Sequence, residues 1–186
     1  MNTIAENVLQ DFKEGKPYNF AYFKNTSFAF KKISYAKLFG AYLKGSDLTG
    51  TAAVNVELSY ADLTDIIGKS VDLTNASMIK AKLIRAFLPE SCFNSVDLRD
   101  ASLQGADLEG ASFKDAKLLC ANFTGANLTG VNFTGANLTG VNFTGANLAG
   151  ANFTYTNLTG VNFTGANLTS IELDLATLTG AIGLSE

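Results

Sequence analysis

Side chains able to carry out catalysis are scarce among the 186 residues of this chain. The sequence contains no histidine, so the usual general base and the commonest metal ligand are both missing. No serine stands beside a base that could activate it, and the many Thr-Gly pairs lack the lysine and the helix that a phosphate-binding loop requires. We therefore expect a protein that is not an enzyme and that holds neither a metal ion nor another cofactor.

Aspartates recur at one regular place in the sequence, directly before a large apolar residue. They are Asp47, Asp62, Asp72, Asp97 and Asp107. A row of unpaired carboxylates could imitate the regularly spaced phosphates of DNA and so inhibit a DNA-binding enzyme. The formal net charge is only −3, however, and a lysine stands 20 positions after both Asp62 and Asp97. A DNA mimic is therefore an alternative to the main hypothesis, a structural module that binds another protein.

The two cysteines, Cys92 and Cys120, occupy different positions of the repeat described below, so we expect no disulfide. Free thiols are typical of the cytosol. No apolar run is long enough to span a membrane, and the first residues do not resemble a signal peptide. The near-neutral charge gives no reason to expect binding to nucleic acid. These observations predict a cytoplasmic protein that binds neither membranes nor nucleic acid.

The elements that must position these side chains come from a five-residue repeat. Between Ala121 and Ser170 the unit recurs ten times without an insertion, as in Ala-Asn-Phe-Thr-Gly. In the same phase, a large apolar residue stands at almost every fifth position from Phe23 to Leu178, with a small residue two positions earlier. This period fits neither an α-helix nor a long strand. It predicts a short extended piece, with the large and the small residue pointing inward, followed by a corner.

Glycine occupies many of these corners. Phe123-Thr124-Gly125-Ala126 places it third in a four-residue turn, where a type II turn requires a positive φ. At other corners the glycine is replaced, as by Lys80, Arg85 and Glu90. We expect those corners to be of another type.

Charged residues indicate how many repeats form one coil. Opposite charges stacked on neighbouring coils are favoured, and they are commoner than like charges at a separation of four repeats but not at three or five. The opposite pairs four repeats apart are Lys37/Glu57, Asp62/Lys82, Asp65/Arg85, Lys80/Asp100 and Asp97/Lys117. Four repeats per coil predict a square cross-section and about eight coils.

The interior of such a coil should be filled by alternating Phe and Leu. Phenylalanines four repeats apart would stack on one wall, and those in between would stack on the opposite wall. The expected core includes Phe123, Leu128, Phe133, Leu138, Phe143 and Leu148.

The repeat resembles that of the pentapeptide-repeat family. The residues that carry the resemblance have the pattern Ala-Asp/Asn-Leu followed by two turn residues, as in 61–65, 106–110 and 126–130. It extends from about residue 20 to residue 183 and implies an all-β solenoid, a right-handed quadrilateral β-helix. It does not imply one function: many similar proteins are cyanobacterial proteins of unknown role, and a minority resemble DNA mimics that bind and protect DNA gyrase.

Residues 1–17 have a different pattern and form the first of two expected units, the second being the β-helix of residues 18–186. Thr3 and Glu6 resemble a capping box at the start of a helix, and Gly15 and Pro17 would end it. Such a helix would cover the open end of the first coil. The alternative is a helix on which a partner docks.

A possible partner contact lies in the variable middle of the repeat. Ile67 and Phe87 are four repeats apart and should adjoin on the outside of one wall, with Arg85 nearby. An exposed apolar pair with charged neighbours could be a contact site for another protein. The alternative is local repair, because Gly68 leaves space in the core unless Ile66 or Ile67 turns inward, and Pro89 removes one donor from the ladder.

Residues 121–170 contain no charged side chain, so their surface should consist of Asn and Thr columns. Stacked Asn and Thr can form hydrogen bonds along the rod, as in other side-chain ladders. A flat Thr array could instead bind ice or carbohydrate, but Asn and Thr cover every wall alike, whereas a dedicated binding face should differ from the others.

The last repeats lead to Leu178 and Ala181, and the residues that follow are too few for a capping helix. An exposed sheet edge favours pairing with another chain. We therefore consider a weak end-to-end homodimer, and as its alternative a monomer in which Ile182 and Leu184 fold over the end. The sequence names no protein partner.

Overall fold

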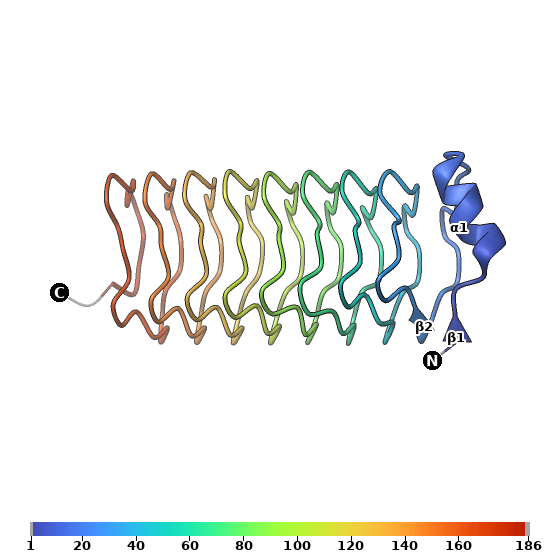
Figure 1. Ribbon diagram of the computed structural model, residues 1–186. Coiled ribbons are helices and arrows are strands. Elements are labelled where there is room, and N and C mark those ends of the chain that lie inside the picture. Colours follow the sequence, from blue (N-terminus) through green and yellow to red (C-terminus); the bar gives the residue numbers. More distant parts are fainter. Residues whose placement is uncertain (1, 185–186) are drawn as a thin grey trace.

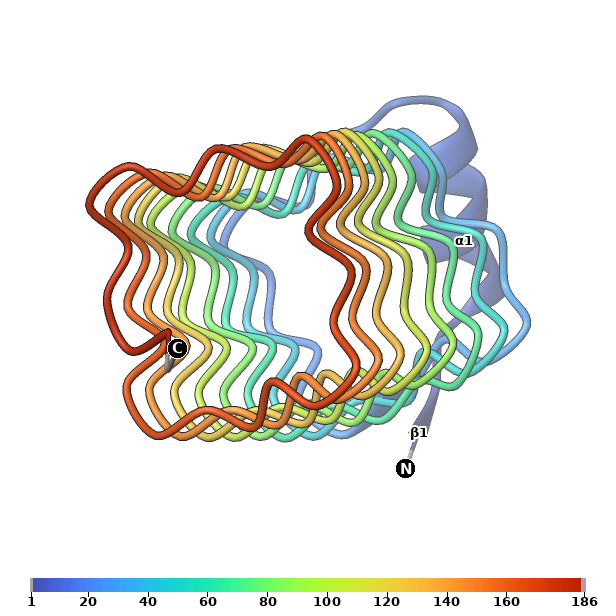
Figure 2. The ribbon, with the colours of Figure 1, turned by 90° about the vertical axis from the view of Figure 1, so that its left-hand side faces the viewer.

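The computed structural model describes residues 2–184, which form a rod of stacked coils (Figure 1). Parallel bridges join residues 20 positions apart on successive coils, as between Asp62 and Lys82 or between Asp97 and Lys117. Viewed along its axis, the rod has a four-sided outline (Figure 2). The expected coil, with four repeats on four walls, is therefore confirmed.

Regular secondary structure is limited to one end of the rod. Strand β1 (Asn2–Thr3) pairs in parallel with strand β2 (Thr26–Ser27), and helix α1 (Glu6–Lys13) lies between them in the sequence. In the rest of the described chain, each repeat contributes a single bridge residue rather than a strand. The chain turns after every short extended piece, so a second consecutive bridge does not form.

Backbone hydrogen bonds hold each coil to the next. The N–H group of Leu138 donates to the carbonyl of Asn157, and that of the corner residue Gly140 donates to the carbonyl of Thr159, both with an N···O distance of 2.9 Å. The pattern recurs on all four walls. The backbone N–H and carbonyl groups of each coil thus find their hydrogen-bond partners on the neighbouring coils.

The core consists of apolar columns that run along the rod. The rings of Phe123 and Phe143 stack with centroids 5.3 Å apart, and Phe133 stacks on Phe153 at the same distance. Rings from opposite walls meet edge to face, as Phe123 and Phe133 do at 6.2 Å and 80°. This alternation of stacked and edge-to-face rings fills the interior. Six residues of this core are 0% exposed: Phe123, Leu128, Phe133, Leu138, Phe143 and Leu148.

Corners have a positive φ whether or not they contain glycine. Gly125 has a φ of 66°, and the N–H group of Ala126 donates to the carbonyl of Phe123 at 3.0 Å, which closes the turn. Three corners without glycine have φ values of 53° to 57°: Lys80, Arg85 and Glu90. The expectation that these corners differ is therefore wrong. The rod imposes one geometry on them, at a cost of about 1–2 kcal/mol for each side chain held in the left-handed region.

Asparagine side chains support the corners rather than linking the coils. The Oδ1 atom of Asn122 accepts hydrogen bonds from the N–H group (2.9 Å) and the Oγ1 hydroxyl (2.6 Å) of Thr124. Bonds along the rod are fewer, as from Asn147 Nδ2 to Thr129 Oγ1 at 2.8 Å. The expected ladder along the rod is therefore a minor feature. An Asn side chain bonds its own backbone two residues on more readily than it reaches a neighbouring coil.

Helix α1 begins later than its sequence pattern predicts. Thr3 lies in strand β1 opposite Ser27, and the N-cap is Ala5, which makes no side-chain hydrogen bond. The expected capping box is therefore wrong, because backbone pairing with the first coil engages Thr3 instead. The helix is held by packing: Phe12 is 1% exposed and its ring lies edge to face with that of Tyr18 at 5.2 Å.

Candidate functional site

An apolar pair lies on the outside of one wall. Ile67 and Phe87 form a parallel bridge and are 40% and 46% exposed. Asp47 precedes them and Asp107 follows them in the same column of bridges. Ile67, Phe87 and Arg85, which lies at the adjoining corner, are the contact residues expected from the sequence. We call these three residues the Ile67–Phe87 patch.

Ion pairs border the patch along one corner of the rod. Arg85 donates to Asp65 in a bidentate arrangement, with Nε to Oδ1 at 2.8 Å and Nη2 to Oδ2 at 3.1 Å. Lys44 Nζ lies 3.7 Å from Asp65 Oδ2 on the other side. The expected neighbourhood of Asp65 and Arg85 is confirmed. The bidentate contact fixes the planar guanidinium beside the apolar pair.

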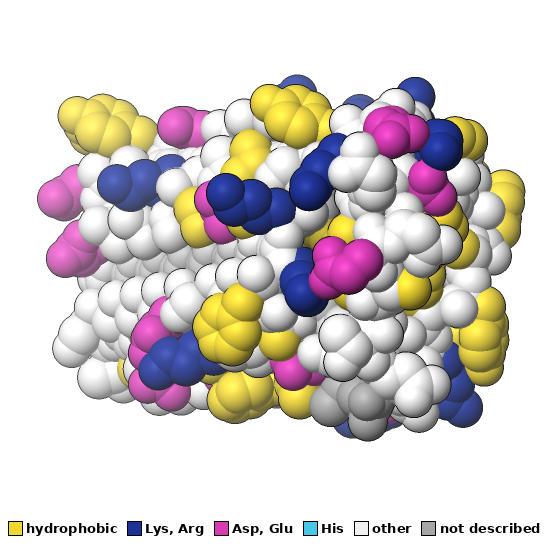
Figure 3. Space-filling model, turned by 45° about the vertical axis from the view of Figure 1, so that its right-hand side comes forward, with side chains coloured by type: hydrophobic (Ala, Val, Ile, Leu, Met, Phe, Trp, Pro, Cys, Tyr) yellow, Lys and Arg dark blue, Asp and Glu magenta, His cyan; other side chains and the backbone are white. Residues whose placement is uncertain are grey.

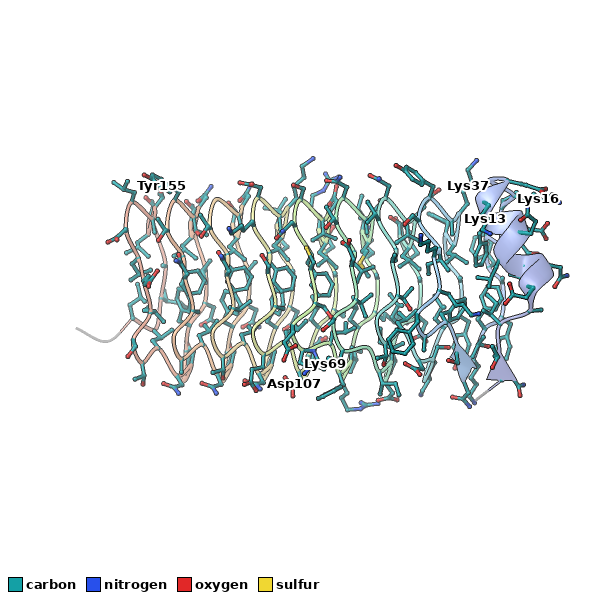
Figure 4. The ribbon with its side chains drawn as sticks, viewed as in Figure 1. Lys13, Lys16, Lys37, Lys69, Asp107 and Tyr155 are labelled. Carbon is teal, nitrogen blue, oxygen red and sulfur yellow. The ribbon has the colours of Figure 1, made fainter. Side chains whose placement is uncertain are left out.

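A second ion pair borders the patch along the next corner. Lys69 Nζ lies 2.9 Å from Glu90 Oε1, with both side chains more than half exposed. Lys69 and Asp107 project from the same side of the rod (Figure 4). The apolar pair therefore lies between two charged ridges, with a carboxylate at each end of its column. An apolar centre with a polar rim is the arrangement found in protein interfaces.

The core beneath the patch is filled without the side chain of Ile67. Ile66 points inward and is 1% exposed, whereas Ile67 remains outside. At Gly68 an added Cβ would lie 2.7 Å from Val71 Cγ2 and 3.0 Å from Leu88 Cδ2, so the space is already filled. The sequence predicts a gap at Gly68 unless Ile66 or Ile67 turns inward, and Ile66 does turn inward. Exposure of Ile67 is consequently not a by-product of a core defect.

Pro89 is also accommodated without loss. It lies at the position before the corner residue, where the N–H group of other repeats bonds to a side chain two residues earlier, as Thr129 does to Asn127. No ladder bond comes from that position, so the expected loss of a ladder donor is wrong. Proline favours this place in a turn because its φ is already fixed near the required value.

The five aspartates do not form a row. The bridge columns place Asp62 on one wall, Asp47 and Asp107 on the next, Asp72 on the third and Asp97 on the fourth. Each accepts a hydrogen bond from the backbone N–H group two residues later, as Asp62 does from Thr64 at 3.0 Å. These carboxylates therefore support corners in the same way as the asparagines do.

Asp97 also has its own cation. Burial alone would raise the pKa of Asp97, but hydrogen bonds from Arg99 outweigh burial and lower that pKa below its usual value. Both Arg99 side-chain contacts are 2.8 Å long. A carboxylate paired in this way is poorly suited to imitate an unpaired phosphate.

Other reactive groups are dispersed. Cys92 and Cys120 are free thiols, as expected. Within residues 2–184, no three or more His, Cys, Asp or Glu side chains cluster in a way that could hold a metal ion. In the same range, no helix has the length and apolar character needed to cross a bilayer.

The uncharged part of the rod presents the same surface on every wall. Its regular, mostly white rows occupy much of the left half of the space-filling view (Figure 3). Asparagine columns run along all four walls, through the bridges Asn122–Asn142, Asn127–Asn147, Asn132–Asn152 and Asn137–Asn157. No wall is distinguished as a face for ice or carbohydrate, which agrees with a structural role for these side chains.

The last coil leaves both side chains and backbone open. Leu178 is 38% exposed, and in the described chain the N–H groups of Leu168 and Leu173 have no acceptor. Ile182 continues the ladder, with its N–H group 2.9 Å from the carbonyl of Val161, and is 55% exposed. It therefore does not fold over the end, contrary to that part of the monomer alternative.

Of the ion pairs that border the patch, the sequence reasoning found Asp65–Arg85 but missed two others. Lys44 pairs with Asp65 and Lys69 pairs with Glu90, each pair separated by one position more than a full coil. A comparison of charged residues exactly 20 positions apart finds only pairs at the same position of the repeat. Long side chains at a corner also reach the following position on the next coil, and a comparison one position longer would have found them.

The comparisons with known proteins agree with this architecture. Residues 71–153 match the family model of the pentapeptide repeat region, and residues 33–67 and 156–182 match that of pentapeptide repeats in eight copies. No curated protein sequence gives a significant match.

Solved structures share the rod. HetL, a pentapeptide repeat protein involved in heterocyst differentiation regulation from the cyanobacterium Nostoc sp. strain PCC 7120, is 28% identical with a TM-score of 0.62, over 98% of this chain and 97% of HetL. A trypsin-treated variant of QnrB1, a plasmid-mediated fluoroquinolone resistance protein, is 19% identical with a TM-score of 0.50, over 89% of this chain and 88% of QnrB1. That second likeness concerns the fold alone. This chain belongs to the pentapeptide-repeat family, and its coil is the right-handed quadrilateral β-helix of that family.

Proposed function

We propose that this protein is a non-enzymatic interaction module that binds a partner protein through the Ile67–Phe87 patch. The observation that carries the proposal is the exposed apolar pair between two ion-paired ridges. The exposure of this apolar pair is not the result of a core defect beneath it, because the space at Gly68 is already filled. Such a small patch suits a weak or transient contact, below the size of standard interfaces.

The rod is the platform for this contact. Residues 18–186 form the proposed β-helix of about eight coils, with four repeats per coil. Residues 1–17 are its proposed cap, in which α1 covers the first coil. A stiff solenoid whose coils are joined by backbone hydrogen bonds holds surface side chains at fixed positions, and this reduces the entropy lost on binding. Free thiols favour a cytoplasmic location.

HetL supports a role of this kind. It is described as involved in the regulation of heterocyst differentiation, and its likeness covers nearly the whole of both chains. A repeat protein can take part in regulation by binding other molecules. We infer a comparable regulatory contact for this chain, with a partner that presents an apolar side chain and carries charges complementary to the ridges.

Capture from the native cell tests this proposal. The double variant Ile67→Ser with Phe87→Ser should lose a protein that the unchanged chain retains. The matched control is Leu119→Ser, because Leu119 is also 40% exposed but lies at another corner of the rod. Capture that is equal for all three proteins, with unchanged thermal unfolding, would contradict the patch as the contact site.

The alternative function is a DNA mimic that binds DNA gyrase or another DNA-binding enzyme. The distribution of the aspartates over four walls does not favour it. A gyrase supercoiling assay separates the two functions. Inhibition or protection at micromolar protein, lost when Asp62 and Asp107 are replaced by Asn, would support the mimic; no effect would leave the interaction module.

For the open last coil we propose two alternative states, a monomer or a weak end-to-end homodimer. In the homodimer, the unpaired N–H groups of this coil and the exposed Leu178 could be covered by the same end of a second copy. Sedimentation over a concentration series should then show association that Leu184→Asp abolishes. A single monomer boundary up to high micromolar concentration, unaffected by that variant, would establish the monomer.

A further inference from the structure

A groove lies between α1 and the first coil, far along the rod from the uncharged repeats. One side is formed by Glu6, Leu9 and Lys13, which share one face of the helix at spacings of three and four residues. The other side is formed by the consecutive residues 30–32, Phe-Lys-Lys. The volume is about 290 Å³, just below the range of about 300–1,000 Å³ for small-molecule sites, so only a small ligand fits.

The groove has an apolar floor and one aromatic wall. Leu9 is 6% exposed and faces the groove from the helix. Phe30 is 78% exposed, yet its ring lies close against the next coil, because a Cβ on Gly50 would be only 2.6 Å from Phe30 Cδ1. The glycine at position 50 thus allows the ring to lie flat beside the groove. A small ring or branched chain could be enclosed between these two side chains.

Positive charge exceeds negative charge around the groove. Lys31 Nζ lies 3.2 Å from Glu6 Oε1, so these two side chains neutralise each other and fix the start of the helix. Lys13 and Lys32 make no ion pair with any residue that the structure describes. Lys13 lies on the last turn of α1, at the edge of the rod beside the first coils (Figure 4). Two ammonium groups therefore remain available, each with three hydrogen-bond donors.

Lys31 owes its position to the end of the solenoid. It occupies the first position of its repeat, which elsewhere is uncharged, mostly small, and points into the core. At the first coil there is no preceding coil to enclose this position, so the side chain turns toward Glu6 on the helix. The groove is consequently a product of the junction between the cap and the rod and does not recur along it.

We propose that this groove binds a small amphipathic carboxylate, in which a ring or branched apolar group lies on Leu9 and Phe30 and the carboxylate meets Lys13 and Lys32. The site is separate from the Ile67–Phe87 patch and does not depend on the function proposed for it. A carboxylate without an apolar group would gain only screened contacts with exposed lysines, and a neutral ring would gain only the apolar contacts with Leu9 and Phe30.

A matched pair of probes tests the proposal: phenylacetate and its neutral counterpart phenylacetamide, added to the ¹⁵N-labelled full chain and followed by NMR. Phenylacetate should give saturable shifts in α1 and residues 30–32, with an affinity about threefold to thirtyfold higher than that of phenylacetamide. The difference should shrink as salt is raised from about 0.01 M to about 1 M, where the Debye length falls from about 30 Å to about 3 Å.

Three variants locate the site. Lys13→Gln and Lys32→Gln should each weaken phenylacetate binding several-fold while leaving phenylacetamide unaffected, and Phe30→Ala should weaken both. Lys114→Gln is the control, because Lys114 is exposed at a distant corner and should change neither. Equal binding of the two probes, shifts outside the groove, or no saturation at tens of millimolar phenylacetate would overturn the proposal. Inorganic phosphate binding as well as phenylacetate would show an unspecific anion site and would overturn it too.

Discussion

Replacement of Gly68 by Leu tests how the core is filled beneath the patch. The repeat has a large apolar residue at this position on almost every wall, so the sequence alone suggests that Leu would improve the fold. The structure suggests the opposite. An added Cβ would lie 2.7 Å from Val71 Cγ2, 3.0 Å from Leu88 Cδ2 and 3.2 Å from Leu48 Cβ, before any further carbon is placed.

The neighbours of Gly68 have little freedom to move away. Leu48 and Leu88 lie on the coils on either side, and ladder bonds hold these coils together: Leu48 donates to Ile67 at 2.7 Å, and Gly68 donates to Phe87 at 2.8 Å. Overpacking costs about 1–3 kcal/mol, and loss of the glycine returns about 0.4–1 kcal/mol through the unfolded chain. Because Leu adds a whole branched side chain to a filled space, the overpacking cost should lie at the upper end of this range, and we expect a net loss of about 2–2.5 kcal/mol.

A double-mutant cycle with Val71→Ala makes the test specific, since this change removes the methyl group that the new side chain meets first. Alone, Val71→Ala should cost about 1.5 kcal/mol or more, because two methyl groups are lost from the core. Together, the two changes should cost about 1–2 kcal/mol less than the sum of the single changes. Urea unfolding followed by circular dichroism measures all four proteins. Stability unchanged or raised by Gly68→Leu, or strict additivity in the cycle, would refute this account of the core.

Three further predictions concern core, corner and charge. Leu138→Ala should cost about 2–5 kcal/mol in urea unfolding, because the side chain is fully buried, whereas Thr139→Ala should cost at most about 1 kcal/mol; equal losses would contradict the assigned phase. Gly145→Ala should cost about 1 kcal/mol by the same measurement, since φ is +66° but no atom lies within 4 Å of the new Cβ, and a gain in stability would show that the corner tolerates another φ. The pKa of Asp97 is lowered in the folded state, so its pairing stabilises the protein above the unfolded pKa of about 3.9 and is lost as the pH falls through the folded pKa. Arg99→Gln should therefore lower the thermal midpoint more at pH 7 than at pH 2, and an equal decrease at both values would exclude this linkage.

The fold could be predicted because every repeat must bury an apolar side chain at the same position. An apolar residue every fifth position, as at Leu128 and Phe133, fixes the inward phase, and opposite charges such as Asp65 and Arg85 fix the length of the coil. Corner geometry was harder to predict. Arg85 has a φ of 53° because the coils on both sides fix its backbone, and local preference alone would have placed it elsewhere.

Features that depend on contacts between distant segments could not be derived from the pattern. Thr3 has the sequence of an N-cap but pairs with Ser27, because the chain before α1 returns to the first coil as a strand. The filled space at Gly68 depends on how far Val71 reaches into the core, which the spacing does not reveal. The adjacency of Ile67 and Phe87 followed directly from the four-repeat coil and is confirmed, whereas their role as a contact for a partner is a proposal.

Site-specific crosslinking in the native cell tests the central proposal most directly. A photoreactive phenylalanine analogue at position 87 keeps an apolar ring on the patch, and the same analogue at position 119 is the control on another corner with similar exposure. If the Ile67–Phe87 patch is the partner site, irradiation should give one discrete crosslinked product from position 87 and none from position 119. Equal products from both positions, or no product from position 87, would contradict it.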